Sequence, residues 1–452
     1  MFEFLWNLGS FIVALGLLVT VHEYGHFWVA RKCGVKVEKF SIGFGKTLWR
    51  TFDKHGTEYV IALIPLGGYV KMLDGRVDDI TDDEKQFAFN HKSVYQRIAI
   101  VAAGPLANFI FAVFAFYLMF IIGINSVKPI IGEVEPGSIA EKSQLEANSQ
   151  IVAIAGQPTT DWQAVNMALV SQLGADEFTI ATRKTDTTYV KTYDLSVTNW
   201  TFEPSEMTAM DSLGIIPFMP NTSTVIAAIL AGEAGEKSGL QVGDEIISVN
   251  GEAFYGNWQS FVDTIQQIPN QTAVLDVVRG QKTIKVELLV GTRQQNDGRN
   301  VGYIGVSPHV EPWPESHRQT ISYGPIDAIG KAGESTWGLI TLSFNMIGKL
   351  VTGLVSVESL SGPIAIAQGA GTSAGVGFVY FLSFLALISI NLGIINLLPL
   401  PILDGGHLLY YVIELFTGKP VSEKVQEVGF KIGALILLSL MSIAIINDVS
   451  RL

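Results

Sequence analysis

The sequence predicts a multi-pass α-helical membrane protein with four transmembrane helices, a membrane-associated β-element and two tandem α+β domains outside the membrane. The composition supports this class, because 48% of the 452 residues are apolar, 16% are charged and the mean hydropathy is +0.35. A water-soluble globular chain seldom has these values. Charged residues are concentrated between long apolar runs, and the longest charged segment contains an internal repeat.

Four apolar segments are long enough to cross the hydrocarbon core of a bilayer, which takes about 20 helical residues. Each includes a long run without charged residues, except that the last contains Lys431 near its start. The expected transmembrane helices lie in residues 1–30, 98–124, 376–403 and 428–447.

A further uncharged segment, residues 335–348, is too short to cross the membrane, because its helical length is only about 21 Å at 1.5 Å per residue. Its large apolar residues recur at helical spacing, as Trp337, Ile340, Phe344 and Ile347. We therefore expect an amphipathic helix over residues 324–350 that lies in the membrane interface.

The distribution of charge predicts the orientation in the membrane. Residues 31–97 contain 12 basic and 9 acidic residues, whereas residues 124–326 contain 12 basic and 23 acidic ones. The positive-inside rule places residues 31–97 on the cytoplasmic side. The acidic segment and both termini are then expected on the outer side.

Composition also excludes several classes of protein. The net charge of −12 opposes a nucleic-acid surface, so we expect no nucleic-acid partner and take the lipid bilayer as the surroundings. The single cysteine, Cys33, excludes an internal disulfide and a four-cysteine zinc site.

The acidic segment contains two copies of one module, expected over residues 127–220 and 221–310. Glu-Lys-Ser-x-Leu at residues 141–145 recurs at 236–240, and residues 151–156 align with 246–251. The second copy resembles the PDZ domain, which binds extended peptides by strand addition, so we expect two PDZ-like (α+β) domains. Whether they bind a peptide or serve as spacers stays open.

The first copy departs from the PDZ pattern at a turn. It has Gln144, Asn148 and Ser149 at the positions of Gly239, Gly243 and Asp244 in the second copy. These differences leave the turn geometry and the ligand loop of the first module open.

The motif His22-Glu23-Tyr24-Gly25-His26 indicates a zinc site. Residues four apart share one face of a helix, so His22 and His26 can bind one metal ion while Glu23 handles a bound water. His22 follows the start of the first apolar run by about 27 Å of helix, which places the ion within the cytoplasmic half of the bilayer. Ionisable groups at such a depth are costly and are usually functional.

A catalytic zinc ion needs a third protein ligand, and Asp404 fits best. It ends the longest uncharged run, on the same expected side of the membrane as His22. Pro399 and Pro401 forbid a regular helix there, so the chain is expected to unwind beside a cavity or site. His407 and Glu414 are the alternative ligands.

The chain as a whole resembles the site-2 protease family of intramembrane zinc metalloproteases. The resemblance rests on His-Glu-Tyr-Gly-His in the first span, Asn-x-x-Pro-x-Pro-x-x-Asp-Gly at residues 396–405, Gly-Pro-Leu-Ala-Asn at 104–108 and the tandem PDZ-like modules. It implies one catalytic Zn²⁺ held by His22, His26 and Asp404, with Glu23 as the catalytic acid and base. It also implies that Asn396 holds substrate backbone near the ion.

The family further suggests a membrane-entering β-element within residues 31–97, with strands around 40–45 and 58–63. Such an element could pair with an unwound substrate. The expected substrate-binding residues are Asn396, Pro399, Pro401, Gly43, Phe44 and Gly45.

The resemblance implies a bacterial inner-membrane protein whose PDZ-like domains and termini are periplasmic and whose active site lies toward the cytoplasm. Its expected substrates are single-pass membrane proteins, namely an already trimmed anti-sigma factor and remnant signal peptides. The outer modules are expected to exclude substrates with bulky domains. The rival interpretations are a catalytically silent scaffold and a transporter with a structural metal.

Overall fold

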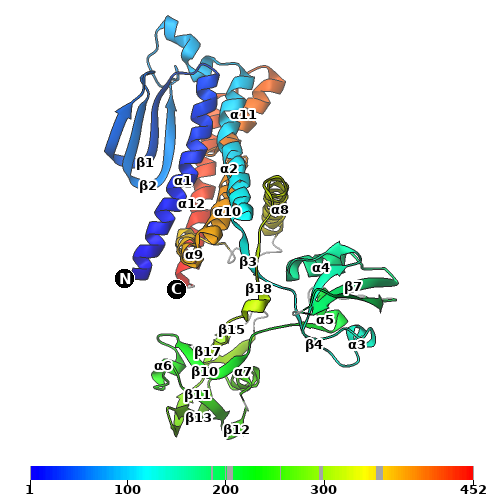
Figure 1. The fold of residues 1–452 in the computed structure, drawn as a ribbon. Helices are drawn as coiled ribbons and strands as arrows, with labels where there is room; N and C mark the ends of the chain where they lie inside the picture. The colour runs from blue at the N-terminus through cyan, green and yellow to red at the C-terminus, as the bar shows by residue number, and fades with distance from the viewer. Residues whose placement is uncertain are drawn as a thin grey trace. The chain divides into compact units, whose positions relative to one another are not determined.

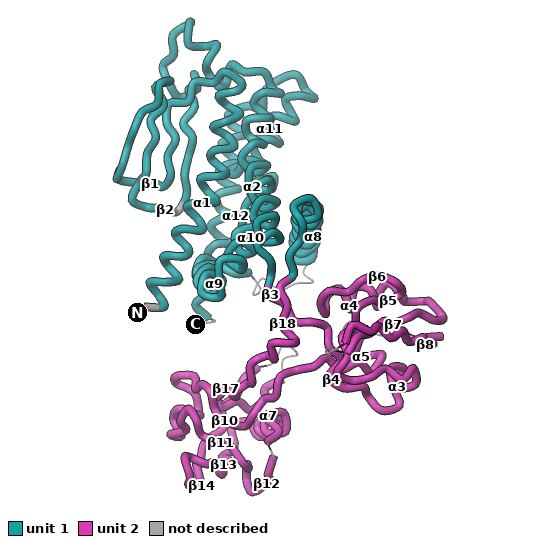
Figure 2. Tube along the Cα trace, in the orientation of Figure 1, with its two compact units in different colours: residues 1–124, 321–452 teal, residues 125–320 magenta. Residues whose placement is uncertain are grey.

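The structure is a computed structural model that describes residues 2–184, 187–198, 200, 207–254, 256–294, 299–352 and 360–450. The chain divides into two compact units (Figure 2). Unit 1 comprises Met1–Ile124 and Ile321–Leu452, and unit 2 comprises Asn125–Thr320. Each unit has its own clusters of buried apolar side chains.

Unit 1 is a bundle of helices with a β-element beside it (Figure 1). Its helices are α1 (Phe2–Lys32), α2 (Val94–Ile122), α8 (Pro325–Val351), α9 (Pro363–Val376), α10 (Phe378–Leu397), α11 (Asp404–Thr417) and α12 (Glu423–Ser450), with the short 3₁₀ helices Asp82–Phe87 and Phe89–His91 before α2. Within the described ranges, four helices are long and apolar enough to cross a membrane: Glu3–Lys32, Val94–Ile122, Phe378–Leu397 and Glu423–Ser450.

The helix α8 is not one of these four. It packs on α2 and α10 through small side chains, because Ala328 and Ala332 are fully buried in the same cluster as Phe116 and Ile390. Its other face exposes Trp337 and further large apolar residues.

The sequence sets the ends of the central helices. Ser93 caps α2 by accepting a hydrogen bond from the backbone of Gln96, whose side chain reaches back to Ser93. The helix α10 ends at Leu397, and Pro399 and Pro401 follow directly in the loop to α11. This loop positions Asp404 at the first residue of α11.

The helix α9 is held by residues from α1 and from α12. The carboxylate of Asp448 accepts hydrogen bonds from the backbone N–H groups of Gly362, Ile364 and Ala365, at 2.8 to 3.1 Å. These are the free donors at the start of α9. Farther along α9, the carbonyl of Gly371 accepts a hydrogen bond from the indole of Trp6 at 2.9 Å.

The β-element consists of β1 (Val37–Phe52) and β2 (Glu58–Met72), each of which doubles back on itself. In β1 the bend coincides with the positive φ angles of Gly43 (89°) and Gly45 (86°). Phe40 pairs with both Val70 and Tyr59, whereas Arg50 pairs with Val60. The segments therefore lie in the order 47–52, 58–62, 39–42 and 68–72, so that 47–52 and 68–72 form the two edges.

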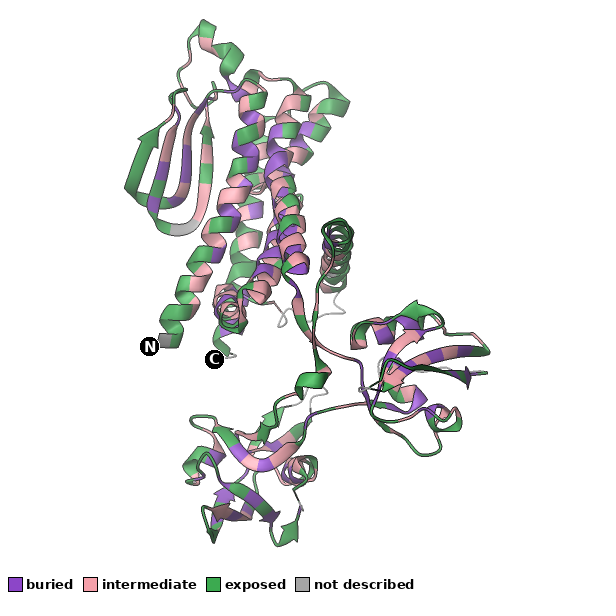
Figure 3. Cartoon of the chain, in the orientation of Figure 1, coloured by how far each residue is buried: buried purple, intermediate pink, exposed green. Residues whose placement is uncertain are grey.

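The β-element is fixed to the end of α1. Arg31 forms an ion pair with Asp53, in the turn between β1 and β2, and Phe27 packs between Phe40 and Tyr59 at centroid distances of 5.5 and 5.9 Å. The edge segment 47–52 of β1 is exposed along its length (Figure 3). Its exposed apolar side chains include Leu48, Trp49 and Phe52.

Unit 2 contains two β-rich modules whose first seven elements follow the same order and whose last elements differ. The first comprises β4 (Ile131–Val134), α3 (Ile139–Lys142), β5 (Ser149–Ile154), β6 (Gln157–Pro158), α4 (Trp162–Val170), β7 (Glu177–Lys184), β8 (Val190–Ser196), α5 (Ala209–Leu213) and β9 (Ile215–Pro217). The second comprises β10 (Thr222–Ile229), α6 (Ala234–Lys237), β11 (Glu245–Val249), β12 (Glu252–Ala253), α7 (Trp258–Gln266), β13 (Thr272–Arg279), β14 (Lys282–Leu289), β15 (Gly291–Gln294), β16 (Asn300–Tyr303) and β17 (Val306–Val310).

The strand pairing of the two modules also corresponds. The first strand pairs with the last in each module, as β4 with β9 and β10 with β17. The central strands lie in the orders β6-β5-β7-β8 and β14-β13-β11-β10-β17. The chain enters and leaves unit 2 through β3 (Ile124–Val127) and β18 (Arg318–Ile321), which pair with each other.

The turn geometry that the sequence left open in the first module is the same as in the second. Gln144 and Asn148 have φ angles of 56° and 57°, in the same left-handed region as Gly239 (80°) and Gly243 (91°). The first module therefore keeps the turn without glycine, at a cost of about 1 kcal/mol for such a residue. Asn tolerates this region better than most residues, because its side chain can hydrogen-bond locally.

Candidate metal centre

The helix α1 presents His22, Glu23 and His26 near its C-terminal end. The two imidazoles are four residues apart and therefore share one face of the helix. Both are buried, each with 8% of its surface exposed, and their Nε2 atoms are 3.2 Å apart. Such burial needs a partner for each ring nitrogen.

Close packing of α1 on α2 determines where the imidazole of His26 lies. A Cβ atom on Gly104 would stand 2.2 Å from Nε2 of His26, and one on Gly25 would stand 2.3 Å from the carbonyl oxygen of Ala103. The ring of His26 thus lies directly on the backbone of α2. Its Nδ1 atom is 2.9 Å from the carbonyl oxygen of Ile100, which can only accept a hydrogen bond, so Nδ1 carries the proton and Nε2 is free for a metal.

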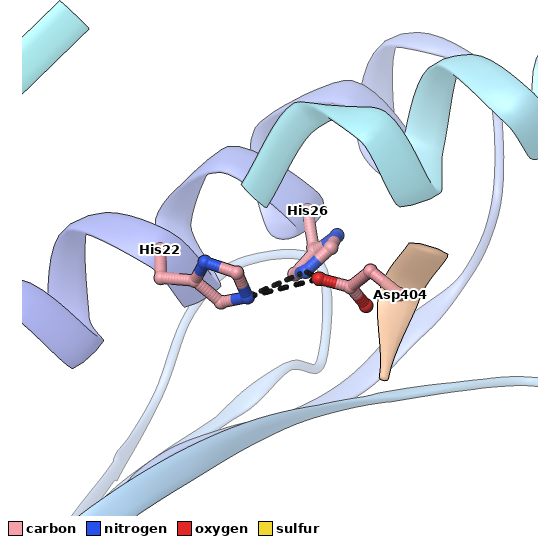
Figure 4. Close-up of side chains that lie close together, drawn as sticks. All are labelled: His22, His26 and Asp404. Atoms are coloured by element: carbon pink, nitrogen blue, oxygen red, sulfur yellow. Dashed lines mark hydrogen bonds and ion pairs between the residues drawn. The ribbon is translucent and has the colours of Figure 1, made fainter. Parts of the chain in front are cut away.

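Asp404 reaches the two histidines from the loop between α10 and α11. A Cβ atom on Gly405 would meet the carbonyl oxygen of Leu397 at 2.3 Å, and one on Gly406 would meet that of Leu400 at 2.4 Å. Only glycine fits at these two positions, so the first turn of α11 can pack directly against the backbone of the preceding loop. The Oδ2 atom of Asp404 lies 3.1 Å from Nε2 of His22 and 3.4 Å from Nε2 of His26 (Figure 4).

These three ligand atoms fit a tetrahedral zinc ion. They all lie within 4.8 Å of one another, and the separations of 3.2, 3.1 and 3.4 Å match the edges of a tetrahedron around zinc. Tetrahedral ligands about 2.0 to 2.2 Å from the ion are about 3.3 to 3.6 Å apart, close to these separations. Within the described part of the chain, Oδ2 of Asp404 is buried without a hydrogen-bond partner, as expected of an atom that ligates a cation.

A cavity of about 390 Å³ opens beside the three ligands. Its lining comes from α1, α2, the second half of β2, the 3₁₀ helix Phe89–His91, the end of α10, the loop that follows it and the start of α11. The lining residues are His22, Glu23, His26, Tyr69, Val70, Met72, Phe89, Ile100, Val101, Asn396, Ile402, Leu403 and Asp404. Glu23 therefore faces the same cavity as the metal-binding atoms.

The other predicted site residues differ in their relation to this cavity. Asn396 lines it, whereas Pro399, Pro401, Gly43, Phe44 and Gly45 are not among the lining residues. Phe44 stacks on Tyr69, which does line the cavity, at a centroid distance of 6.1 Å.

The alternative ligands lie elsewhere. His407 is not in the group of ligand atoms and packs edge-on against Tyr410. Glu414 accepts two hydrogen bonds from Arg97 of α2, at 3.1 and 2.7 Å. Sequence reasoning missed Tyr69, Val70 and Met72, because only the doubling back of β2 brings these residues to the site.

The buried His-His-carboxylate group, the glutamate beside it and the membrane-crossing length of α1 define the class of metalloproteases that act within membranes. The model of Peptidase family M50 matches residues 10–440. The chain therefore belongs to Peptidase family M50, the site-2 protease family, and is a zinc metalloprotease of that type.

Relatives of known description match over the full length of both chains. Protease RseP of Yersinia pestis is 50% identical over 454 residues, and regulator of sigma-E protease RseP of Escherichia coli K12 is 49% identical over 452 residues. Each alignment covers 100% of this chain and 100% of the relative. A PDZ domain of an SdrC-like protein from Listeria monocytogenes covers 21% of this chain and 93% of that domain, with 18% identity and a TM-score of 0.16.

Proposed function

We propose that this protein hydrolyses peptide bonds within or next to the transmembrane segments of single-pass membrane proteins. The observation that carries the proposal is the convergence of His22, His26 and Asp404 on one point beside Glu23, in a helix long enough to cross a membrane. His22, His26 and Asp404 would hold one Zn²⁺ ion. When bound, the ion supplies Lewis acidity that acidifies water and polarises a peptide carbonyl.

Glu23 is the proposed acid and base. It lies in the cavity next to the ligands, where its carboxylate takes a proton from the attacking water and then delivers that proton to the leaving amine. The peptide C–N bond breaks as the new C–O bond forms, so one water molecule is consumed per cleavage.

The edge segment 68–72 of β2 is the proposed substrate-binding strand. A helical substrate keeps its carbonyls in internal hydrogen bonds, so it must be extended before cleavage. Tyr69, Val70 and Met72 line the cavity, and in the described chain this segment pairs only with β1, which leaves its other edge for strand addition. Asn396, near the end of α10, also lines the cavity and is proposed to hold the backbone of the substrate.

The remaining predicted residues are proposed to act through this strand and loop. Gly43 and Gly45 bend β1, Phe44 supports Tyr69, and Pro399 and Pro401 keep the loop before Asp404 unwound. All five would shape the substrate path rather than contact the reacting atoms.

The proposed location is the bacterial inner membrane, with unit 2 and both termini periplasmic and the active site toward the cytoplasm. The basic segment 31–97 and the acidic segment 124–326 support this orientation. An already trimmed anti-sigma factor is the first proposed substrate, because full-length relatives carry the name regulator of sigma-E protease. Remnant signal peptides are the second proposed substrate class.

The test compares wild type with Glu23→Gln, and with His22→Ala and Asp404→Ala. We expect stoichiometric zinc in wild type and in Glu23→Gln, loss of zinc in the two ligand variants, and no cleavage of a single-pass membrane substrate by any of the three. Cleavage by Glu23→Gln would contradict the assignment, and a scaffold would function unchanged in all variants.

A further inference from the structure

Asn108, in the middle of α2, lies on the far side of His22 from the metal-binding point. Its side chain is fully buried, and its Nδ2 atom is 3.1 Å from Nδ1 of His22. The other nitrogen of the same imidazole, Nε2, faces His26 and Asp404. Asn108 therefore contacts one nitrogen of the His22 ring, and the metal-binding point lies at the other nitrogen.

The chemistry of imidazole fixes what Asn108 must offer. A neutral imidazole carries one proton, so when Nε2 gives its lone pair to a metal, the proton resides on Nδ1 and needs an acceptor. The carboxamide of Asn108 has one acceptor and one donor group of nearly the same shape. A half-turn of this amide exchanges them and brings Oδ1 to the place where Nδ2 lies.

The hydrogen bonding of Asn108 is consistent with this exchange. Within the described residues, its Oδ1 atom is buried and has no hydrogen-bond partner. A buried carbonyl oxygen without a donor costs about 1 to 3 kcal/mol. The Nδ1–H group of a metal-ligating His22 is a donor that would satisfy it.

The equivalent partner of His26 is already in place. The carbonyl oxygen of Ile100 faces its Nδ1 atom at 2.9 Å. Ile100 and Asn108 both belong to α2, so this one helix contacts the Nδ1 atoms of both histidines. The hydroxyl of Ser389 on α10 donates to the backbone carbonyl of Asn108 at 2.8 Å and anchors this part of α2.

We propose that Asn108 is a positioning residue of the metal centre, whose carboxamide oxygen accepts a hydrogen bond from Nδ1–H of His22 and thereby directs Nε2 onto the ion. This inference rests on the proposed function only in taking His22 as a ligand. It gives a role to the Gly-Pro-Leu-Ala-Asn segment: Gly104 makes room for the ring of His26, and Asn108 orients that of His22.

The test measures zinc affinity of the purified full chain by competition with a chelator. Asn108→Leu keeps the side-chain size but removes the acceptor, and we expect its zinc affinity to fall by about 10- to 100-fold. Asn108→Asp keeps an acceptor oxygen at the same position, and we expect it to bind zinc within a few-fold of wild type. In the cobalt-substituted protein, the visible absorption band of Asn108→Leu should differ from that of wild type, and the band of Asn108→Asp should resemble it.

The matched control is Asn447→Leu, which removes another buried carboxamide, the one that donates from α12 to the carbonyl of Leu360. It should leave zinc affinity unchanged. If Asn108→Leu does not fold, Asn108→Ala takes its place with the same expected loss.

Two results would overturn the proposal: zinc affinity of Asn108→Leu within twofold of wild type, or an equal loss in Asn108→Leu and Asn108→Asp. Failure of the proposed function gives a different result, because then wild type itself lacks stoichiometric zinc or His22→Ala retains it.

Discussion

At the scale of single residues, the metal centre depends on the missing side chain of Gly104. Because a Cβ atom there would stand 2.2 Å from Nε2 of His26, Gly104→Ala must displace the imidazole or separate α1 from α2. We expect zinc affinity to fall by at least about 10-fold and proteolysis to be lost. Metal analysis and a cleavage assay measure both effects.

Gly16→Ala is the matched control, since it adds a methyl group to the same pair of helices at a position with open space around it. It should keep zinc and activity. Normal zinc content in Gly104→Ala would show that the ring of His26 is not held against α2 in this way.

Residues that share a local motif could be predicted from sequence, and residues that meet only in the fold could not. The spacing of His22 and His26 by itself requires one helical face. Asp404 was predicted because it is the charged residue that ends an uncharged run. Asn108 belongs to the Gly-Pro-Leu-Ala-Asn motif, but its role could not be predicted, because its contact with His22 depends on how α2 crosses α1.

At the scale of elements, an ion pair fixes α11, which begins with Asp404, to α2. Arg97 and Glu414 are only 12% and 14% exposed, and the guanidinium also lies 4.8 Å from the ring of Tyr411. Removing one partner leaves the other charge buried and unpaired. We expect Glu414→Gln to lower the free energy of unfolding by about 3 kcal/mol, measured by denaturant titration in detergent, while zinc stays stoichiometric.

The control for this pair is Glu427→Gln, which breaks an exposed ion pair with Lys431 on α12. Its effect should be below about 0.5 kcal/mol. Loss of zinc from Glu414→Gln at full stability would instead identify Glu414 as a ligand.

The attachment of the β-element to α1 should depend on pH. Burial raises the pKa of Asp53, but hydrogen bonds from Arg31 and from the backbone amides of Thr57 and His55 outweigh it and lower the pKa to about 2. A carboxylate with a lowered pKa stabilises the fold above its unfolded pKa near 3.8, and the contribution disappears as the pH falls toward 2.

We therefore expect amide hydrogen exchange of residues 37–72, corrected for its intrinsic pH dependence, to be slower in wild type than in Asp53→Asn at pH 6. The difference should correspond to about 1 kcal/mol, as for a well-formed ion pair near the surface. It should shrink as the pH falls below 3.8, and most of it should be gone at pH 2. A difference that is the same at both pH values would contradict this role of Asp53.

The doubled course of β1 and β2 could not be predicted from the sequence. The strand-like stretches expected around 40–45 and 58–63 both lie within observed strands. Their residue types do not reveal, however, that Phe40 pairs with two different parts of β2. Register over such distances is set by packing against α1, which no local pattern records.

At the scale of the whole molecule, unit 2 is inserted into unit 1 through two paired strands. The backbone N–H of Lys128 donates to the carbonyl of His317 at 2.8 Å, so the two ends of the insertion are adjacent. Replacing residues 129–316 by a short Gly-Ser linker should therefore leave unit 1 folded, because none of the described residues of unit 2 belongs to its buried clusters.

We propose that unit 2 acts as a pair of PDZ-like modules that exclude substrates with bulky outer domains. The deletion variant should keep stoichiometric zinc and should cleave both untrimmed and trimmed substrates, whereas wild type cleaves only the trimmed form. If untrimmed substrates stay uncut by a zinc-loaded deletion variant, the modules are not the filter.

At this scale, the sequence predicted the membrane spans from long apolar runs and the two modules of unit 2 from the internal repeat. Hydropathy indicates a membrane span because every backbone group of a spanning helix is satisfied within the helix, which leaves composition as the main signal. The pairing of β3 with β18 had no such signal, since these short strands are separated by the whole of unit 2.

The hold of Asp448 on α9 has a consequence for biosynthesis. Trp6 and Asp448, which are more than 400 positions apart in the sequence, both hydrogen-bond to the short helix α9. Asp404 is likewise translated long after His22 and His26. A nascent polypeptide that has not yet emerged as far as these acidic residues can insert its first helices into the bilayer but cannot assemble the ion's ligands. The ribosome thus delivers a dormant precursor, and hydrolytic capacity arises only once the late segments have been threaded into place.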